Sequence, residues 1–381
     1  MSAGYEIVKY APPHKPLVAC LQTHLWSSDV GRNACYLEWK YERNPGPDGA
    51  LIYLALHGDE VVGMRGFHPA TLEAGTPSYT FHVLIAGDAL VAPGHRDKGL
   101  VTRIMKAAYA DLTAGSYRFF LSVGGANRVN TFGLLTLGWK SAGALSPMGR
   151  IAKGATARAK LNHVMAQLPW LWRFRGKRFL YSAAQRHPFR RLDAAKRGRA
   201  SNAAPPIAIE ATPRIDAMAA LVKRLGHDGR VRYVRDPEYL AWRYQSPLSD
   251  FRFLYWGDAH LEGYLVLSTR ASDLGSWYRV YIADLEASDI KIRSELLAAA
   301  IRWGQFPELV TWAASLGTAE IQLLKDHGFE PVDAHDTERG CPCVLVRPLG
   351  QTPSAADWML GDRTLLDPGT WDIRLLYSMR A

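Results

Sequence analysis

The sequence predicts an α/β protein that repeats one fold twice along the chain. With 381 residues, the chain exceeds the size at which a single hydrophobic core usually stops growing, so two domains are expected. Two similar hexapeptides, YLEWKY at 36–41 and YLAWRY at 239–244, mark corresponding points in the two halves. The same order of predicted strands and helices follows each hexapeptide, which favours duplication over coincidence.

In the first copy, short apolar runs separated by turn signals predict a series of strands. The apolar residues Leu100, Ile104, Ala108 and Leu112 recur every fourth position and predict a helix with one buried face. A second helix is expected to end at Gly138. The predicted strands are 50–56, 61–67, 79–91 and 117–123, and the predicted helices are 100–112 and 127–138.

The second copy has the same pattern. The pair Gly328–Phe329 ends its last helix, as Gly138 and Trp139 end the second helix of the first copy. We expect Trp39 and Trp242 of the hexapeptides to anchor equivalent corners between helix and sheet. The predicted strands are 251–257, 261–268, 277–286 and 308–314, and the predicted helices are 288–303 and 318–329.

The stretch VAPGHRDKGLVTRIM, which starts at Val91, is the most informative in the chain. Its Arg96-x-x-Gly99 loop joins a predicted strand to a predicted helix, so backbone N–H groups converge at a helix N-terminus and favour a phosphate or pyrophosphate. Arg96 and Lys98 add positive charge. The loop has neither the Gly-Lys-Ser/Thr of a P-loop nor the glycine pattern of a dinucleotide fold.

In this context the chain resembles the GNAT superfamily of acyl-CoA N-acyltransferases. Val91, Pro93, Arg96 and Gly99 match its V-x-P-x-x-R-x-x-G pattern, and Asn127 opens a helix that ends in the family's Gly-aromatic pair. The resemblance implies two curved mixed sheets flanked by helices, splayed in a V where acetyl-CoA enters as co-substrate. It implies a cofactor-binding set of Val91, Arg96, Asp97, Lys98, Gly99, Leu100, Val101, Thr102 and Asn127.

The sequence departs from the family pattern at two positions. Val101 stands where the motif usually has Gly or Ala. The tyrosine that often protonates the departing thiolate in this family is replaced by Leu134, so the general acid is unassigned, with water or Tyr109 as alternatives.

Direct acyl transfer to an amine needs a group that accepts a proton from the ammonium. The base in this superfamily commonly lies on the long strand before the loop, where Asp88 and His82 are the titratable residues. Asp88 is the stronger candidate because such strands carry a bulge near its position. The alternatives are a turn or cap carboxylate for Asp88 and an ordinary structural histidine for His82.

The second copy lacks the phosphate loop. Its corresponding stretch, ADLEASDIKIRSELL, has no glycine and carries Asp284, Glu286 and Asp289, which would repel a pyrophosphate. We therefore predict that only the first copy binds CoA. A tandem arrangement in which one half is degenerate resembles that of peptidoglycan-bridge aminoacyltransferases and of GNAT proteins associated with surface polysaccharides. The predicted division is a GNAT domain at 1–148, a connector at 149–205 and a degenerate GNAT-like domain at 206–381.

Residues 150–199 supply the positive excess of the chain, whose net charge is +10. Their basic residues alternate with aromatic ones, which is compatible with an anionic membrane surface, an inter-domain connector, RNA or an acyl carrier protein. Membrane and connector are favoured, and nucleic acid is not expected as a partner.

The four cysteines are too few and too scattered for a disulfide framework or a zinc site, and they are interpreted as buried free thiols. No metal is expected. The absence of a long apolar run or signal-like N-terminus predicts a cytoplasmic protein. The membrane interpretation of residues 150–199 would make it peripheral on the inner face of the membrane.

The favoured function is transfer of an acetyl group from acetyl-CoA to a small-molecule or lipid-linked primary amine, such as an amino sugar of a surface polysaccharide precursor. A catalytically silent tandem module and an aminoacyl-tRNA-dependent transferase remain alternatives.

Overall fold

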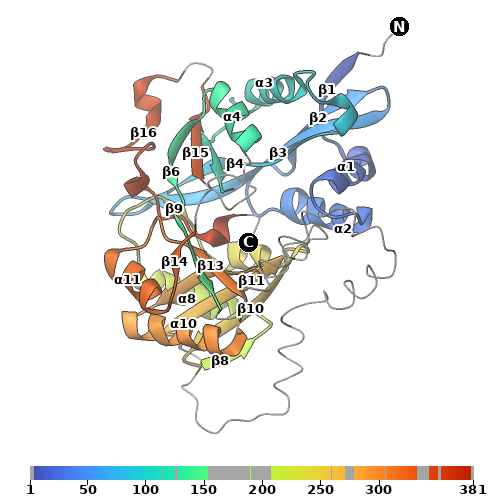
Figure 1. The fold of residues 1–381 in the computed structure, drawn as a ribbon. Helices are drawn as coiled ribbons and strands as arrows, with labels where there is room; N and C mark the ends of the chain where they lie inside the picture. Colours follow the sequence, from blue (N-terminus) through green and yellow to red (C-terminus); the bar gives the residue numbers. More distant parts are fainter. Residues whose placement is uncertain are drawn as a thin grey trace, which may run out of the picture.

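The protein is described from a computed structural model. It describes residues 4–113, 115–124, 128–152, 189, 207–258, 260–270, 279–304, 306–332, 343–350 and 353–378. Two mixed sheets with helices against them form two lobes, one above the other in Figure 1. The predictions for Asn127 and for nearly all of residues 150–199 lie outside the described residues.

The N-terminal sheet has the strand order β1-β2-β3-β4-β5-β15-β6, and β9 pairs with β3 beside this path. Its strands are β1 (Tyr5–Lys9), β2 (Leu51–His57), β3 (Glu60–Ala74), β4 (Tyr79–Val91), β5 (Phe119–Val123), β6 (Lys140–Ala144), β9 (Arg232–Tyr233) and β15 (Cys343–Pro348). All neighbouring strands are antiparallel except β4 and β5, which are parallel.

The C-terminal sheet repeats this topology strand for strand. Read from its far edge, its order is β8-β10-β11-β12-β13-β7-β14, with β12 and β13 as the parallel pair. Its strands are β7 (Pro147–Ile151), β8 (Ile207–Glu210), β10 (Ser249–Trp256), β11 (Gly263–Arg270), β12 (Arg279–Ala287), β13 (Glu308–Trp312) and β14 (Glu330–Pro331).

The two halves of the chain exchange one strand. Strand β7 leaves the first half and pairs between β13 and β14 of the C-terminal sheet. Strand β15 makes the reciprocal move and pairs between β5 and β6, where it lies among the strands of the upper lobe in Figure 1. Each sheet therefore contains a strand from the other half, and the proposed division into 1–148, 149–205 and 206–381 stays a prediction.

Helices cover both faces of the N-terminal sheet. One face packs against α1 (Lys15–Leu21), α2 (Val30–Leu37) and the π-helical turn that follows, η3 (Glu38–Glu42). The other face packs against α3 (Leu100–Leu112) and α4 (Arg128–Thr136). Neighbouring residues of β2 serve different faces, with Ile52 and Leu54 toward α1 and Tyr53 toward α3, as the twofold period of a strand requires.

The C-terminal lobe has its own helices, strands and turns. These are α8 (Ile215–Leu225), α9 (Pro237–Arg243), α10 (Ile290–Gly304), α11 (Thr318–Asp326), the hairpin β16 (Met359–Leu360) and β17 (Arg363–Thr364), and the short turn η8 (Leu375–Tyr377). The chain end lies between the two lobes in Figure 1. None of the helices in the described ranges is long and apolar enough to cross a bilayer.

The hexapeptides meet each other at the interface between the lobes. Trp39 lies in the turn η3 and Trp242 in α9, and their rings stack 5.0 Å apart at 12°. Each indole Nε1 donates a hydrogen bond of 2.7 Å to the backbone carbonyl of the other tryptophan, 203 residues away. The two tryptophans therefore join the two copies symmetrically, beyond the corner role that the sequence predicts.

Strand β4 and helix α3 have the predicted bounds, and the α/β class with two mixed sheets is confirmed. The interpretation of the cysteines as buried is wrong for Cys20 and Cys35, which are exposed, and Cys343 is half-buried. Cys20 and Cys35 lie on the outer sides of short amphipathic helices, a placement that the small apolar character of cysteine does not indicate. Cys20 and Cys35 are free thiols.

Candidate active site

The parallel strands β4 and β5 separate and leave a V-shaped opening in the N-terminal sheet. They pair only at Leu84 with Phe120 and at Ile85 with Leu121, although β4 continues to Val91. The pairing of β3 with β4 shifts register between Arg65 and Phe67, which is a β-bulge on β4. A pocket lies in this opening, and we call it the V pocket. Its walls come from β3, β4, β5, α4, the turn η3 and the C-terminal segment.

The loop before α3 has the form that an anion site needs. Asp97 and Gly99 adopt positive φ angles of 61° and 67°, and no side chain caps the N-terminus of α3. A Cβ atom on Gly99 would meet no atom within 4 Å, so the backbone borders open space. The uncapped N–H groups and the helix dipole therefore fit a phosphate or pyrophosphate.

The side chains around this loop differ in exposure. Arg96, Asp97, Lys98, Val101 and Thr102 are exposed, and Val101 points away from the core of the lobe. The predicted set also includes Val91, which is half-buried, and Leu100, which is buried against the sheet and positions the helix without reaching the open space. Lys98 Nζ donates a hydrogen bond of 2.9 Å to the hydroxyl of Tyr5.

Asp88 lies in the bulge and lines the V pocket, as a catalytic group would. Its carboxylate is buried and already engaged, by Lys40 Nζ at 2.8 Å and by Gln22 Nε2 at 3.1 Å. The backbone N–H of Asp88 donates to the hydroxyl of Tyr41 at 3.2 Å. Both the side chain and the backbone of Asp88 therefore connect the bulge to the helical segments that pack on one face of the sheet.

His82, the other predicted base, is not among the residues that line the V pocket. It lies earlier on β4, where its Nδ1 is 3.2 Å from Thr71 Oγ1. Tyr109, one alternative for the general acid, lies on the buried face of α3, and its hydroxyl accepts a hydrogen bond of 2.7 Å from Trp139 Nε1. Leu134, at the position of the expected tyrosine, does line the pocket.

Sequence reasoning missed two basic residues of the pocket. Arg65 and His68, both on β3, are buried and line it, and neither makes a hydrogen bond or ion pair with another described residue. Burial lowers the pKa of Arg65. Burial, Lys40 and Arg243 together hold the pKa of His68 well below its usual value, so this imidazole is neutral near pH 7. The signal that could have identified them is the presence of an Arg and a His inside an otherwise largely apolar strand.

The C-terminal segment also contributes to the pocket. Tyr377 and Ser378 line it, although they are encoded more than two hundred residues after β5. The ring of Tyr377 stacks on Tyr233 with centroids 4.1 Å apart. No local sequence pattern connects this segment with the N-terminal sheet, because only the packing of the two lobes brings them together.

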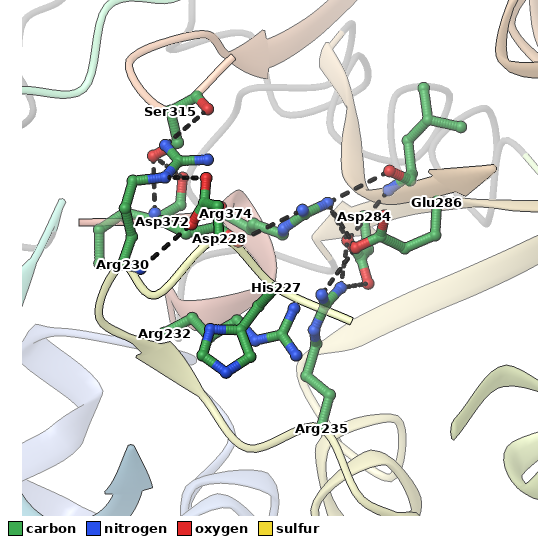
Figure 2. A network of polar contacts seen from close by, with 12 residues as sticks. His227, Asp228, Arg230, Arg232, Arg235, Asp284, Glu286, Ser315, Asp372 and Arg374 are labelled. Atoms are coloured by element: carbon green, nitrogen blue, oxygen red, sulfur yellow. Dashed lines mark hydrogen bonds and ion pairs between the residues drawn. The ribbon is translucent and has the colours of Figure 1, made fainter. Parts of the chain in front are cut away.

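The C-terminal sheet has a counterpart of Asp88. In the first copy Gly63 pairs with Val91, and in the second copy Gly263 pairs with Ala287 at the equivalent position. Asp88 lies three residues before Val91, and Asp284 lies three residues before Ala287, so the two aspartates correspond. Figure 2 shows how Asp284 is enclosed.

The Asp284 side chain is fully buried and is surrounded by charged and polar groups. Arg235 Nη1 lies 3.0 Å and Arg374 Nη1 lies 3.3 Å from its oxygens, and the hydroxyl of Tyr264 donates to it at 2.7 Å. Both arginines also pair with Glu286, at 2.6 Å and 2.9 Å. Although burial opposes ionisation, the two arginines lower the pKa of Asp284, which therefore remains a carboxylate.

This network changes the physical reason for expecting no CoA in the second copy. Asp284 and Glu286 are neutralised inside the lobe and do not form a negative turn. What closes the site is Asp289, whose Oδ1 accepts the N–H of Ile292 at 2.8 Å and caps α10, and Arg374, which lies against Asp284 and Leu285. No group of three or more potential metal ligands is present in the described part of the chain.

Comparisons with known proteins agree with this architecture. Residues 19–131 match the model of the acetyltransferase (GNAT) family. A search of curated proteins with the sequence gave no match. The fold is similar to a GCN5-related N-acetyltransferase from Anabaena variabilis ATCC 29413, with a TM-score of 0.55 and 11% identity over 91% of this chain and 73% of that one.

Two further solved structures share the fold. A conserved protein from Enterococcus faecalis V583, described as a probable N-acyltransferase, has a TM-score of 0.54 at 11% identity and covers 91% of this chain and 73% of its own. A tandem GNAT protein from the clavulanic acid biosynthesis pathway has a TM-score of 0.50 at 11% identity and covers 92% and 100%.

The fold and the family match define the class of the protein. The chain consists of two GNAT folds, and residues 19–131 match the model of the acetyltransferase (GNAT) family, whose members generally use acetyl-CoA as co-substrate. The solved structures therefore show the fold of the whole chain, and the family match places the acetyltransferase-like sequence in the N-terminal lobe.

Proposed function

We propose that the protein transfers an acetyl group from acetyl-CoA to a primary amine in the V pocket of the N-terminal lobe. The observation that carries the proposal is the uncapped N-terminus of α3, with open space at Gly99, in the same sheet as the pocket between β4 and β5. In this proposal the backbone amides from Lys98 to Thr102 hold the pyrophosphate, and the charges of Arg96 and Lys98 support it.

The charges of the V pocket favour a neutral amine. Lys40 and Arg65 bring two positive charges and Asp88 brings one negative charge. A surplus positive charge disfavours a bound ammonium and so lowers its pKa, which supplies the unprotonated nitrogen that attacks a carbonyl. Asp88 stays the predicted proton acceptor, with Lys40 and Gln22 fixing the orientation of its carboxylate.

We further propose that the acceptor is an amino sugar, such as one of a surface polysaccharide precursor. The support is the resemblance of the tandem arrangement to polysaccharide-associated GNAT proteins. Contact of residues 150–199 with an anionic cytoplasmic membrane surface is also a proposal. Liposome flotation with and without residues 150–199 tests it, and equal flotation of the two proteins would contradict it.

Calorimetric titration with acetyl-CoA tests the donor site. Gly99→Glu places a carboxylate in the anion site and should weaken binding at least about tenfold, and Arg96→Ala should weaken it by up to about tenfold. Gly361→Glu is the matched control, because Gly361 has a similar φ of 65° and equally open surroundings in the C-terminal lobe. Unchanged affinity in both Gly99→Glu and Arg96→Ala would overturn the proposal.

A second candidate function is a tandem module that binds CoA without turnover. It is favoured by Leu134, which lines the V pocket where a proton-donating tyrosine is expected. Release of CoA in the presence of a panel of amines separates the two functions. Tight acetyl-CoA binding with no release for any amine supports the silent module, whereas amine-dependent release supports the enzyme.

A further inference from the structure

A second pocket lies between the two lobes, and we call it the interlobe pocket. It is lined by β3, by the loop at 44–46 and by residues of β9 and α9 from the second half. His68 lines both the interlobe pocket and the V pocket, so the two are neighbours that share one side chain. The aromatic rings of Tyr233, Tyr239 and Trp242 form part of its wall.

Three buried side chains of the interlobe pocket have polar atoms without a partner. Both ring nitrogens of His68 and the hydroxyls of Tyr233 and Tyr239 make no hydrogen bond with any described residue. The exposed fractions are 1% for His68, 1% for Tyr233 and 9% for Tyr239. A buried polar atom without a hydrogen bond costs about 1–3 kcal/mol, so several together in one pocket indicate a polar occupant.

The charges around the pocket select the chemistry of that occupant. Lys40 and Arg243 already disfavour a positive charge at His68, as the lowered pKa of its imidazole indicates. An ammonium is therefore a poor partner there, whereas a hydroxyl is neutral and can both donate and accept. A hydroxyl also suits either tautomer of the imidazole and either orientation of a phenol.

The outer part of the pocket has the opposite charge. Asp236 and Glu238, both exposed, line it near the N-terminus of α9. Asp236 Oδ1 accepts the backbone N–H of Tyr239 at 2.8 Å and caps this helix. A positively charged group of the same occupant is favoured at this rim by the two carboxylates.

We propose that the interlobe pocket is the acceptor site and that it takes a polyhydroxylated amine, of the amino sugar or aminocyclitol type. Its hydroxyls bind His68, Tyr233 and Tyr239, its C–H faces pack on the aromatic wall, and its reacting nitrogen passes His68 into the V pocket. The inference rests on the proposed function and adds where the acceptor lies and which groups recognise it.

The transfer balances with the groups named. The unprotonated nitrogen forms a bond to the thioester carbonyl carbon, and the C–S bond breaks. One proton leaves the ammonium before attack and passes to Asp88 or solvent, and a second leaves the nitrogen and ends on the CoA sulfur. His68 gains no proton in this scheme, because it serves as a hydrogen-bonding partner of the acceptor.

The test compares glucosamine with cyclohexylamine, a ring amine without hydroxyls, at saturating acetyl-CoA. Tyr239→Phe and Tyr233→Phe remove only a hydroxyl, so each should lower kcat/KM for glucosamine about three- to tenfold and leave that for cyclohexylamine unchanged. His68→Leu should lower the ratio of kcat/KM for glucosamine to kcat/KM for cyclohexylamine in the same direction. The ratio of the two amines within each variant cancels their different intrinsic reactivities.

Tyr244→Phe is the matched control. The hydroxyl of Tyr244 is also buried without a described partner, but Tyr244 lines neither pocket. This variant should leave both amines unchanged. Thermal unfolding of the phenylalanine variants should be no lower than that of the wild type, because no hydrogen bond between described residues is lost.

Three results would overturn the inference. The first is an equal loss for both amines in the Tyr233 and Tyr239 variants, which would indicate a structural role. The second is no change for glucosamine, which would indicate that water alone occupies these groups. The third is turnover of cyclohexylamine but not glucosamine by the wild type. The proposed function fails separately, by the loss of acetyl-CoA binding or of all amine-dependent release.

Discussion

The two sheets began as copies of one fold, and their V-shaped openings now differ in what fills them. In the N-terminal lobe, Asp88 lines a pocket that also contains Arg65 and His68, neither of which makes a hydrogen bond or ion pair with another described residue. In the C-terminal lobe, the equivalent Asp284 is enclosed by Arg235 and Arg374. The buried carboxylates of the second opening therefore have internal cationic partners, whereas Arg65 and His68 of the first opening make no hydrogen bond or ion pair with another described residue.

The C-terminal segment serves both lobes and links these two outcomes. Arg374 completes the charge network of the second lobe, and three residues later Tyr377 lines the V pocket of the first. Arg243 of the second hexapeptide holds this segment through the carbonyls of Leu376 and Ser378, at 2.8 Å and 3.0 Å. The packing of the C-terminal lobe therefore helps to form the V pocket of the N-terminal lobe.

The largest effect is expected in the filled site. Arg235→Met removes one cation from a network of buried carboxylates and should lower the free energy of unfolding by about 3–5 kcal/mol. Arg302→Met is the control, because Arg302 forms an exposed pair with Glu295 and should cost no more than about 1 kcal/mol. Urea denaturation measures both, and equal effects would show that the network is not the structural centre of this lobe.

In the V pocket of the N-terminal lobe, substitution of Lys40 and substitution of Arg65 should have different effects on stability. Lys40→Met leaves the buried carboxylate of Asp88 without its counter-ion and should destabilise by about 3–5 kcal/mol. Arg65→Met should change stability by less than about 1 kcal/mol, because Arg65 has no described carboxylate partner to abandon. Both should slow transfer. A large loss of stability in Arg65→Met would show that Arg65 has a structural role.

Substitution of either tryptophan at the interface between the lobes should lower stability by a similar amount. Trp39→Phe and Trp242→Phe each remove one indole donor and its hydrogen bond of 2.7 Å to the other tryptophan's carbonyl, so each should cost about 0.5–1.5 kcal/mol. The double variant should cost less than the sum, since the two rings stack on each other. Clearly unequal losses of stability in the two single variants, measured by thermal unfolding, would show that the two tryptophans do not contribute equally to the interface between the lobes.

The smallest effect is a pH dependence of stability. The pKa of His68 in the folded protein lies well below its ordinary value of 6.5, so below pH 6.5 the unfolded state binds a proton that the folded state does not. Stability should therefore fall as the pH is lowered from 6.5 toward 5. His68→Leu should flatten this slope. His327→Gln is a control in the second lobe, where a smaller change of the same sign is expected because its pKa is also lowered. An unchanged slope in His68→Leu would contradict the account.

The sequence predicted most of the fold because its elements carry local signals. The bounds of β4 and α3 follow from an apolar run and a fourfold period, and the loop at Arg96–Gly99 follows from its own residues. The exchange of β7 and β15 was not predictable, since each strand has an ordinary local pattern and only its partners are distant. Of the candidate site, Asp88 was found from its place on β4, whereas Tyr377 depends on packing between the lobes. Asn127 and most of the basic segment lie outside the described residues.

Only the N-terminal copy is expected to bind the acyl donor. The number of acetyl-CoA molecules bound per chain, from calorimetric titration of the wild-type protein, tests it most directly. One molecule per wild-type chain is expected, and Gly99→Glu should weaken binding to this single site at least about tenfold. Two molecules per wild-type chain, or an unchanged affinity in Gly99→Glu, would show that the C-terminal copy also binds the donor or that the α3 loop does not hold it.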